Sequence, residues 1–102
     1  MAYRTKKEPG NDPKGNKLLG LKITSGAEIA MNKYEKDAWA VVDKVRAGVN
    51  ANNGTYKVNG KTCNHTKAGS KKYAVAWWTD AKYVYVEALL EHTGSANDYR
   101  VV

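Results

Sequence analysis

A sparse set of side chains in the second half of this sequence has the types that cleave RNA without a metal. The set is made of titratable and cationic residues, namely His65, Lys71, Lys72, Glu91, His92, Tyr99 and Arg100. Such cleavage needs a base for the ribose 2′-hydroxyl, an acid for the leaving 5′-oxygen, and cations for the phosphate. We assign proton transfer to His92 and Tyr99. Arg100 and Lys71 are assigned to the phosphate, because a guanidinium fork matches two phosphate oxygens. No spacing here is a motif by itself, so a solvated loop histidine is the alternative.

The segment 56–72 is the best candidate for binding a polyanion, because it contains five lysines and no acidic residue. We expect nucleic-acid contacts from cations and rings in and beside it, namely Lys57, Lys61, His65, Lys67, Lys72, Tyr73 and Trp77. Aromatic rings that stack on unpaired bases contribute about 1–3 kcal/mol each, which favours RNA or single strands. The alternative is structural: lysines protect an edge hairpin from aggregation, and tryptophans fill the core. At least one of Trp77 and Trp78 must be core, since adjacent strand residues point to opposite faces.

Charge and composition are those of one small basic domain. The 102 residues include 17 Lys and Arg against 10 Asp and Glu, which gives a net charge of +7. Hydrophobic residues make up 42% and charged residues 26%, as in folded globular chains. The charge favours RNA or another polyanion as partner, although the same charge also serves solubility.

Several activities lack their sequence signatures. There is no phosphate-binding loop, nucleophile elbow, CxxC pair or zincin motif. One cysteine and two histidines cannot make the usual four-ligand zinc site, and we expect neither a metal nor a cofactor. Cys63 is more readily a small buried residue than a nucleophile paired with His65. No apolar run suits a membrane helix or a signal peptide, so we expect a cytoplasmic chain without membrane contact.

The N-terminal half is predicted to contain an arm, a strand and one main helix. Residues 1–17 have both prolines and five cations without apolar periodicity, which predicts a flexible basic arm before a single domain at 18–102. Apolar alternation over 19–23 predicts a strand. Capping-box spacings allow a helix to begin at Ser25 or at Asn32, or to restart after a kink. The helix ends near Ala47 and has an apolar stripe at Tyr34, Ala38, Val41, Val42, Val45 and Val49.

The C-terminal half is predicted to be sheet. Residues 55–58 and 61–64 form a hairpin around Asn59-Gly60, and 73–78 and 83–90 form a second one. Strict alternation would put Val84, Val86, Ala88 and Leu90 on one face of the last long strand, and Tyr83, Tyr85, Glu87 and Leu89 on the other. Residues 99–102 add a short strand. The expected fold is α+β, an antiparallel sheet of four to five strands with the helix on one face and the other face free for function.

Residues 71–92, with the loop and Tyr99-Arg100 that follow, resemble the closing hairpin of RelE-like toxins. The resemblance covers a basic-to-aliphatic strand, a tight acidic turn, a second aliphatic strand and a polar loop before a short strand. It implies metal-independent RNA cleavage and neutralisation by a cognate antitoxin or immunity protein. By position, Lys71 and Lys72 match the basic residues that open the strand, His92 the polar residue after the next strand, and Tyr99 the aromatic near the end.

The sequence departs from that family in two places. Arg100 is the only arginine in the second half, where the family usually has one within or just after the hairpin. The first half predicts one good helix, where the family tends to have two in succession. Two other functions therefore stay open. One is a phage or mobile-element accessory protein that binds nucleic acid or an acidic protein surface without catalysis, and the other is a structural subunit whose arm lies on a neighbour.

Overall fold

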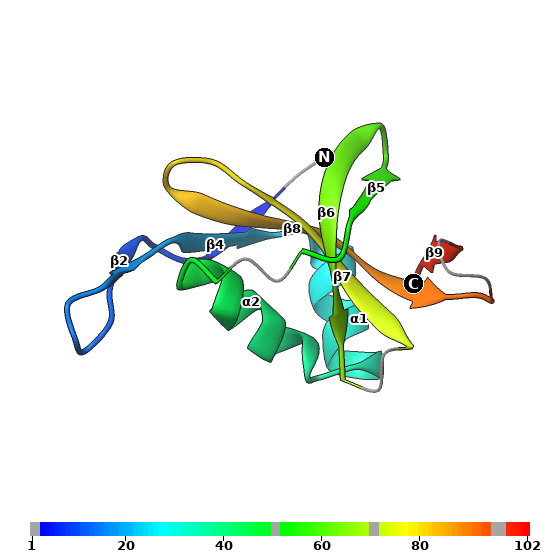
Figure 1. The fold of residues 1–102 in the computed structure, drawn as a ribbon, viewed down its shortest axis with the longest axis horizontal. Coiled ribbons are helices and arrows are strands. Elements are labelled where there is room, and N and C mark those ends of the chain that lie inside the picture. The colour runs from blue at the N-terminus through cyan, green and yellow to red at the C-terminus, as the bar shows by residue number, and fades with distance from the viewer. Residues whose placement is uncertain (1–2, 50–51, 70–71, 95–97) are drawn as a thin grey trace.

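The computed structural model describes residues 3–49, 52–69, 72–94 and 98–102 (Figure 1). Nine strands and two helices occur within these ranges. They are β1 (Arg4–Lys7), β2 (Gly10–Asn11), β3 (Lys17–Leu18), β4 (Gly20–Ile23), α1 (Ser25–Tyr34), α2 (Ala38–Arg46), β5 (Thr55–Val58), β6 (Lys61–Ala68), β7 (Tyr73–Thr79), β8 (Tyr83–His92) and β9 (Tyr99–Val101). Figure 1 shows both helices on one side of the sheet.

Strand β8 is the centre of a seven-stranded mixed sheet with the order β1-β4-β8-β7-β6-β5. Strand β4 pairs with β8 in parallel, and β9 pairs antiparallel with the far end of β8. The other pairs are antiparallel. The prediction of an antiparallel sheet of four to five strands with one helix is therefore wrong. The parallel pair joins segments more than sixty positions apart in the sequence, so no local pattern could indicate it.

The described part of residues 1–17 forms strands and not the predicted flexible arm. Strand β1 pairs with β4 at the edge of the sheet, and β2 and β3 form a separate two-stranded ribbon. All four residues of β1 are exposed, so the strand has no apolar alternation to reveal it. Ion pairs from Arg4 and Lys6 to Glu28 hold β1 beside α1.

The predicted single helix is two helices. Thr24 caps α1 by accepting a hydrogen bond at Oγ1 from the Ala27 N–H at 3.2 Å, so the cap lies one residue before the predicted Ser25. Glu35 then takes up extended backbone and ends α1. The predicted end near Ala47 is confirmed, because Ala47 is the C-cap of α2. Tyr34 and Val49, the two ends of the predicted stripe, fall outside α2 and are exposed.

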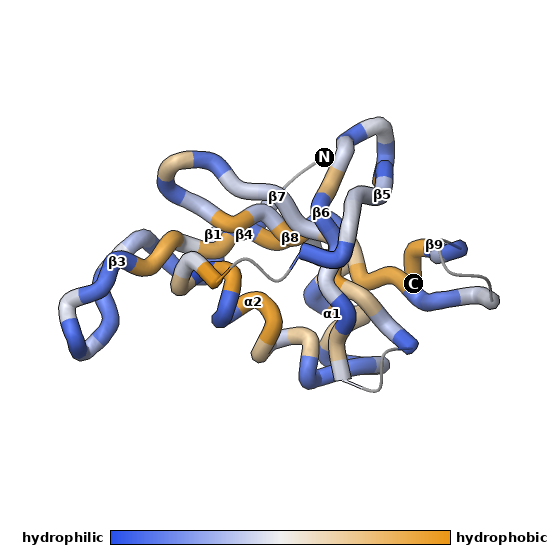
Figure 2. Tube along the Cα trace, in the orientation of Figure 1, coloured by the Kyte–Doolittle hydropathy of each residue, from blue (hydrophilic) through white to orange (hydrophobic). Residues whose placement is uncertain are grey.

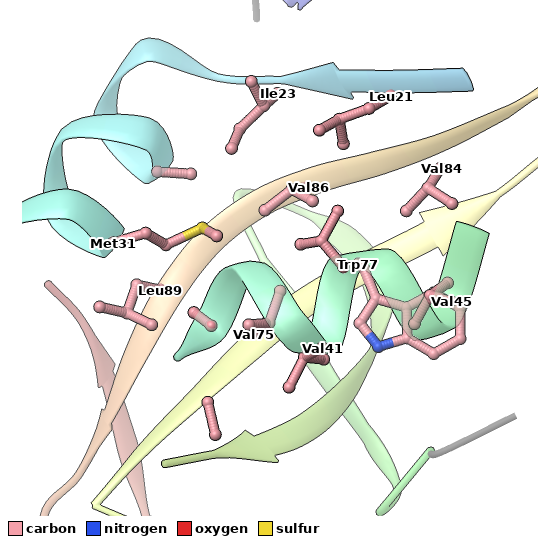
Figure 3. Packing of buried hydrophobic residues seen from close by; sticks show 14 of the residues in the cluster. Leu21, Ile23, Met31, Val41, Val45, Val75, Trp77, Val84, Val86 and Leu89 are labelled. Atoms are coloured by element: carbon pink, nitrogen blue, oxygen red, sulfur yellow. The ribbon is translucent and has the colours of Figure 1, made fainter. Parts of the chain in front are cut away.

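The main core lies between the helices and the sheet (Figure 3). It contains Leu21, Ile23, Met31, Val41, Val45, Val75, Trp77, Val84, Val86 and Leu89, with the remaining buried residues of α1 and α2. Figure 2 shows hydrophobic segments in β4, β8 and α2, and a hydrophilic β2–β3 ribbon at one end of the molecule. The inner residues of the predicted α2 stripe are confirmed as core, since Ala38, Val41, Val42 and Val45 are all buried. Within the described ranges no helix is long and apolar enough to cross a membrane.

A bulge at Glu87 divides β8 into two halves that face opposite ways. Ala76 of β7 pairs with Ala88, but the next residue, Trp77, pairs with Val86, so Glu87 has no partner on β7. Before the bulge the even-numbered residues Val84 and Val86 face the helices; after it Leu89 does. The predicted strict alternation is therefore wrong beyond Val86. A bulge adds one residue to one strand, so it reverses the facing of everything that follows.

The second face of the sheet is curled rather than flat. A smaller core lies on it, formed by Val58, Cys63, Ala74, Ala76, Ala88, Leu90 and Tyr99. The Tyr56 hydroxyl on β5 donates a hydrogen bond to the Tyr99 carbonyl oxygen on β9 at 2.7 Å, although β5 ends the sheet and β9 lies beyond β8. The tight Asn59-Gly60 turn predicted for the β5–β6 hairpin is confirmed, with φ of 50° and 81°. The face that was expected to be free for function is therefore partly covered, because the curl of the sheet buries a small apolar core on it.

Replacing Ile23 by alanine is expected to lower the free energy of unfolding by about 2–5 kcal/mol, because a fully buried side chain leaves a cavity. Ile29 is a matched control, since 65% of this isoleucine is exposed on α1. Ile29→Ala should change the free energy of unfolding by no more than about 0.5 kcal/mol. Urea denaturation followed by tryptophan fluorescence measures both, and equal losses would contradict the packing.

Candidate functional site

Two histidines and two tyrosines meet on the curled face of the sheet, and we call them the imidazole–tyrosine cluster: Tyr56, His65, His92 and Tyr99. The Tyr99 ring centroid lies 5.0 Å from that of His65, 5.1 Å from that of His92 and 5.7 Å from that of Tyr56. All three contacts are edge-on. Tyr99 is therefore the common neighbour of both histidines, although they come from different strands.

Strand geometry brings the cluster together in two steps. His92 and Tyr99 are directly opposite each other in the β8–β9 pair. The bulge at Glu87 turns Ala88, Leu90 and with them His92 toward the curled face. His65 reaches the same face from β6, two residues after the buried Cys63. The curl that joins β5 to β9 then sets His65 against the Tyr99 ring.

His65 is held as a buried, neutral imidazole. Its side chain is 6% exposed, and its Nδ1 is buried without a hydrogen-bond partner in the part of the chain that the structure describes. Burial lowers the pKa of His65 below its ordinary value of 6.5; a hydrogen bond with the Gly54 backbone offsets part of this effect, and the nearby Lys67 adds to it. Gly54 allows this packing, because its φ is +135° and a side chain there would come within 3.2 Å of the His65 ring. A neutral imidazole can accept a proton.

Two of the predicted cations, Arg100 and Lys72, form ion pairs with Glu91. Arg100 binds Glu91 through Nε at 2.7 Å and Nη2 at 2.5 Å, and Lys72 binds the other oxygen of Glu91 at 3.4 Å. The hydrogen bond from Arg100, supported by Lys72, holds the pKa of Glu91 below its ordinary range. Arg100 neighbours Tyr99 on β9 and so points to the opposite face. Lys71 lies outside the described residues.

The residues predicted to bind nucleic acid divide into accessible and inaccessible ones. Trp77 is core, 6% exposed, with its Nε1 donating to the Thr66 hydroxyl at 2.9 Å, so it cannot stack on a base. Tyr73 is half-buried and stacks on Tyr34 beside the helices. Lys57, Lys61 and Lys67 are exposed and form no ion pair with any residue in the described ranges. These three lysines remain available to a polyanion.

A second polar group on the curled face was missed by the sequence analysis. Glu87, at the bulge, is 5% exposed and accepts hydrogen bonds at Oε1 from the Tyr3 hydroxyl and from Trp78 Nε1. Trp78 is stacked on Tyr85, with ring centroids 3.9 Å apart and planes 6° apart. Burial and the Glu87 contact raise the pKa of Tyr3 to about 12, so Tyr3 stays a donor. The one signal in the sequence was a glutamate inside an otherwise apolar strand.

Neither a metal site nor a reactive thiol is evident. In residues 3–49, 52–69, 72–94 and 98–102, no three His, Cys, Asp or Glu side chains are placed to hold a metal ion. Cys63 is 1% exposed, and burial raises the pKa of its thiol to about 11, so at neutral pH it is protonated. The cluster around Tyr99 therefore has the only titratable groups on the described curled face whose ordinary pKa lies near neutrality.

Comparison with known proteins adds no relative. No family model matches the chain, and searches of curated proteins and of solved structures find no match. Function must therefore be inferred from the residues themselves.

The imidazole of His65 is expected to titrate below pH 6.5, because burial penalises its charged form. The unfolded chain then binds the proton more readily, so His65 costs stability as the pH falls through about 6.5 toward the folded pKa. Proton NMR of the two histidines measures the midpoint, and the His92→Gln spectrum assigns the His65 signal. A midpoint at or above 6.5 would contradict a pKa that is controlled by burial of the imidazole.

Proposed function

We propose that this chain is a metal-independent RNA-cleaving domain that acts through the ribose 2′-hydroxyl. The observation that supports the proposal is the contact of two imidazoles, His65 and His92, with the single ring of Tyr99. The two imidazoles are no further apart than those two contact distances together, and both lie on the curled face of the sheet. A base and an acid on either side of one phosphate is what this reaction requires.

In the proposed reaction His65 is the base and His92 the acid. Neutral His65 takes the proton of the 2′-hydroxyl, and the 2′-oxygen forms a bond to phosphorus. The bond from phosphorus to the 5′-oxygen breaks, and protonated His92 gives its proton to that oxygen. The products are a 2′,3′-cyclic phosphate and a 5′-hydroxyl. Tyr99 holds both rings, and this modifies the initial assignment of proton transfer to His92 and Tyr99.

In the proposed reaction the cation that stabilises the phosphate is Lys67 rather than Arg100. Lys67 is exposed, follows His65 by two residues on β6 and so faces the same side. Arg100 and Lys72 are paired with Glu91, and Arg100 points away from the face that holds His65. A cation beside the phosphate stabilises the charge that develops as the 2′-oxygen attacks.

The resemblance to RelE-like toxins is consistent with this proposal. The sequence predicted one helix where the family tends to have two. The structure has two helices in succession, α1 and α2, between β4 and β5, so this difference from the family is removed. We therefore retain, as part of the proposal, a toxin that acts in the cytoplasm and is neutralised by a cognate antitoxin or immunity protein.

A non-catalytic RNA-binding protein is the second candidate. Lys57, Lys61 and Lys67 favour it, because they are exposed along the β5–β6 hairpin without ion pairs in the described chain. Such a protein needs lysines that meet successive phosphates, but no proton transfer. The two candidates differ in what His92 does.

Purified protein is expected to cut RNA in the presence of EDTA. His92→Gln should lower the rate about 100-fold or more, since a general acid contributes that much, while RNA affinity stays unchanged. Gel analysis of a labelled RNA measures cleavage, and a filter or fluorescence assay measures binding. The cyclic phosphate end is identified by mass spectrometry.

Two lysine variants separate local from general charge effects. Lys67→Gln should weaken cleavage more than Lys44→Gln, which removes the same charge from an exposed position on α2, on the helix-covered side. If the wild-type protein binds RNA but leaves it intact, the proposed ribonuclease function is wrong and the non-catalytic RNA-binding function is supported. Cleavage that survives His92→Gln unchanged would remove the cluster from the reaction.

A further inference from the structure

A cavity of about 470 Å³ opens on the curled face beside the bulge of β8. It is lined by Tyr3, Val58, Asn59, Lys61 and Glu87. A neighbouring cavity of about 350 Å³ shares Asn59 and Glu87 with it. Pockets of this size bind small organic molecules, and a few convergent polar groups set their specificity. The imidazole–tyrosine cluster lies elsewhere on the same face, so this cavity is a separate feature.

Glu87 has one carboxylate oxygen left for a ligand. Both hydrogen bonds from Tyr3 and Trp78 end on Oε1. No residue in the described ranges donates a hydrogen bond to Oε2, although the side chain is 5% exposed and borders both cavities. A carboxylate oxygen can accept two hydrogen bonds. Oε2 is therefore available to the N–H donors of a molecule that enters the cavity.

The other side of the cavity supplies donors. Lys61 lies with its Nζ 4.0 Å from the centre of the Trp78 ring, and in the described chain it forms no ion pair with Glu87. Asn59 contributes an amide at the tip of the β5–β6 hairpin. A simple cation would meet Lys61, and a simple anion would meet Glu87. A neutral group with donors on one side and an acceptor on the other matches both.

Among nucleobases, guanine has this pattern. Its Watson–Crick edge carries two adjacent donors, N1–H and the 2-amino group, next to the O6 acceptor. Adenine would turn its N1 acceptor toward the carboxylate, and cytosine and uracil lack two adjacent donors. Unpaired bases are read by hydrogen bonds on this edge and by contact with aromatic rings, and Tyr3 provides such a ring.

We propose that the cavity between Glu87 and Lys61 binds an unpaired guanine base, with Oε2 of Glu87 accepting from N1–H and the 2-amino group and Lys61 or Asn59 donating to O6. The inference rests on the proposed function in taking the base to be part of an RNA substrate. Glu87 and His92 are five residues apart on β8, about 16 Å along a strand. The bound guanosine is therefore a different nucleotide from the one that is cut.

Binding of mononucleotides to the full chain tests the cavity without any cleavage. Guanosine 5′-monophosphate should bind at least about tenfold more tightly than adenosine 5′-monophosphate, since one good hydrogen-bonded pair discriminates by that much. The two carry the same phosphate, so the ratio reports the base. Calorimetry measures the affinities, and the indole N–H signal of Trp78 in NMR reports whether the site is occupied.

Glu87→Gln should bring the ratio of the two affinities close to one. The amide oxygen of the substituted side chain can still accept from Tyr3 and Trp78, so the fold is expected to survive. Glu91→Gln is the matched control on the same strand and should keep the preference for guanine, because Glu91 binds Arg100 and Lys72 on the other face.

Two outcomes overturn the inference: equal binding of the two nucleotides, and binding of neither. The ratio of the two nucleotide affinities is measured on the wild-type protein alone. The inference can therefore be overturned even if the Glu87→Gln variant folds poorly. The proposed function fails separately. RNA cleavage in EDTA without guanine preference removes the cavity from recognition but keeps the ribonuclease, whereas guanine preference without cleavage keeps the cavity and removes the catalysis.

Discussion

The extra residue at Glu87 in the central strand is the constraint on which the rest of the curled face depends. Without it, His92 would lie on the same face as Val84 and Val86, against the helices. With it, β8 contributes valines to the main core at one end and His92 to the opposite face at the other. The same bulge leaves Glu87 unpaired with β7 and free to bind Tyr3 and Trp78. One backbone irregularity thus creates both polar sites.

The second dependence is the curl of the sheet. The Tyr56 hydrogen bond to the Tyr99 carbonyl joins β5, at the edge of the sheet, to β9, which lies beyond β8, and a small apolar core lies on the same face. Burial of this core is non-directional, whereas the hydrogen bond fixes which residues meet. His65 touches Tyr99 because of that closure. The charges are also divided between the two faces: Glu91 pairs with Arg100 and Lys72, while Lys61 and Lys67 stay exposed on the curled face.

Local signals predicted the local structure well. The Asn59-Gly60 turn, the two hairpins and the buried positions of α2 follow from turn chemistry and periodicity. Strand β1 was not predicted because all of its residues are exposed. The parallel pairing of β4 with β8 was not predicted because no local sequence pattern indicates it. The bulge escaped because Val86-Glu87-Ala88-Leu89 reads equally well as regular alternation. Within the site, the contact between His92 and Tyr99 could be expected, because these residues lie at the facing ends of two strands that are joined by one loop. The contact of His65 and the capture of Arg100 by Glu91 depend on tertiary geometry.

The bulge and the curl together bring both histidines into contact with the ring of Tyr99. Nuclear Overhauser contacts from the ring protons of Tyr99 measure this directly in solution, with the His92→Gln spectrum assigning the imidazoles. We expect contacts from Tyr99 to both His65 and His92. Contacts from His92 to side chains on the helix-covered face, such as Leu89 or Tyr73, with none from Tyr99 to His65, would contradict it.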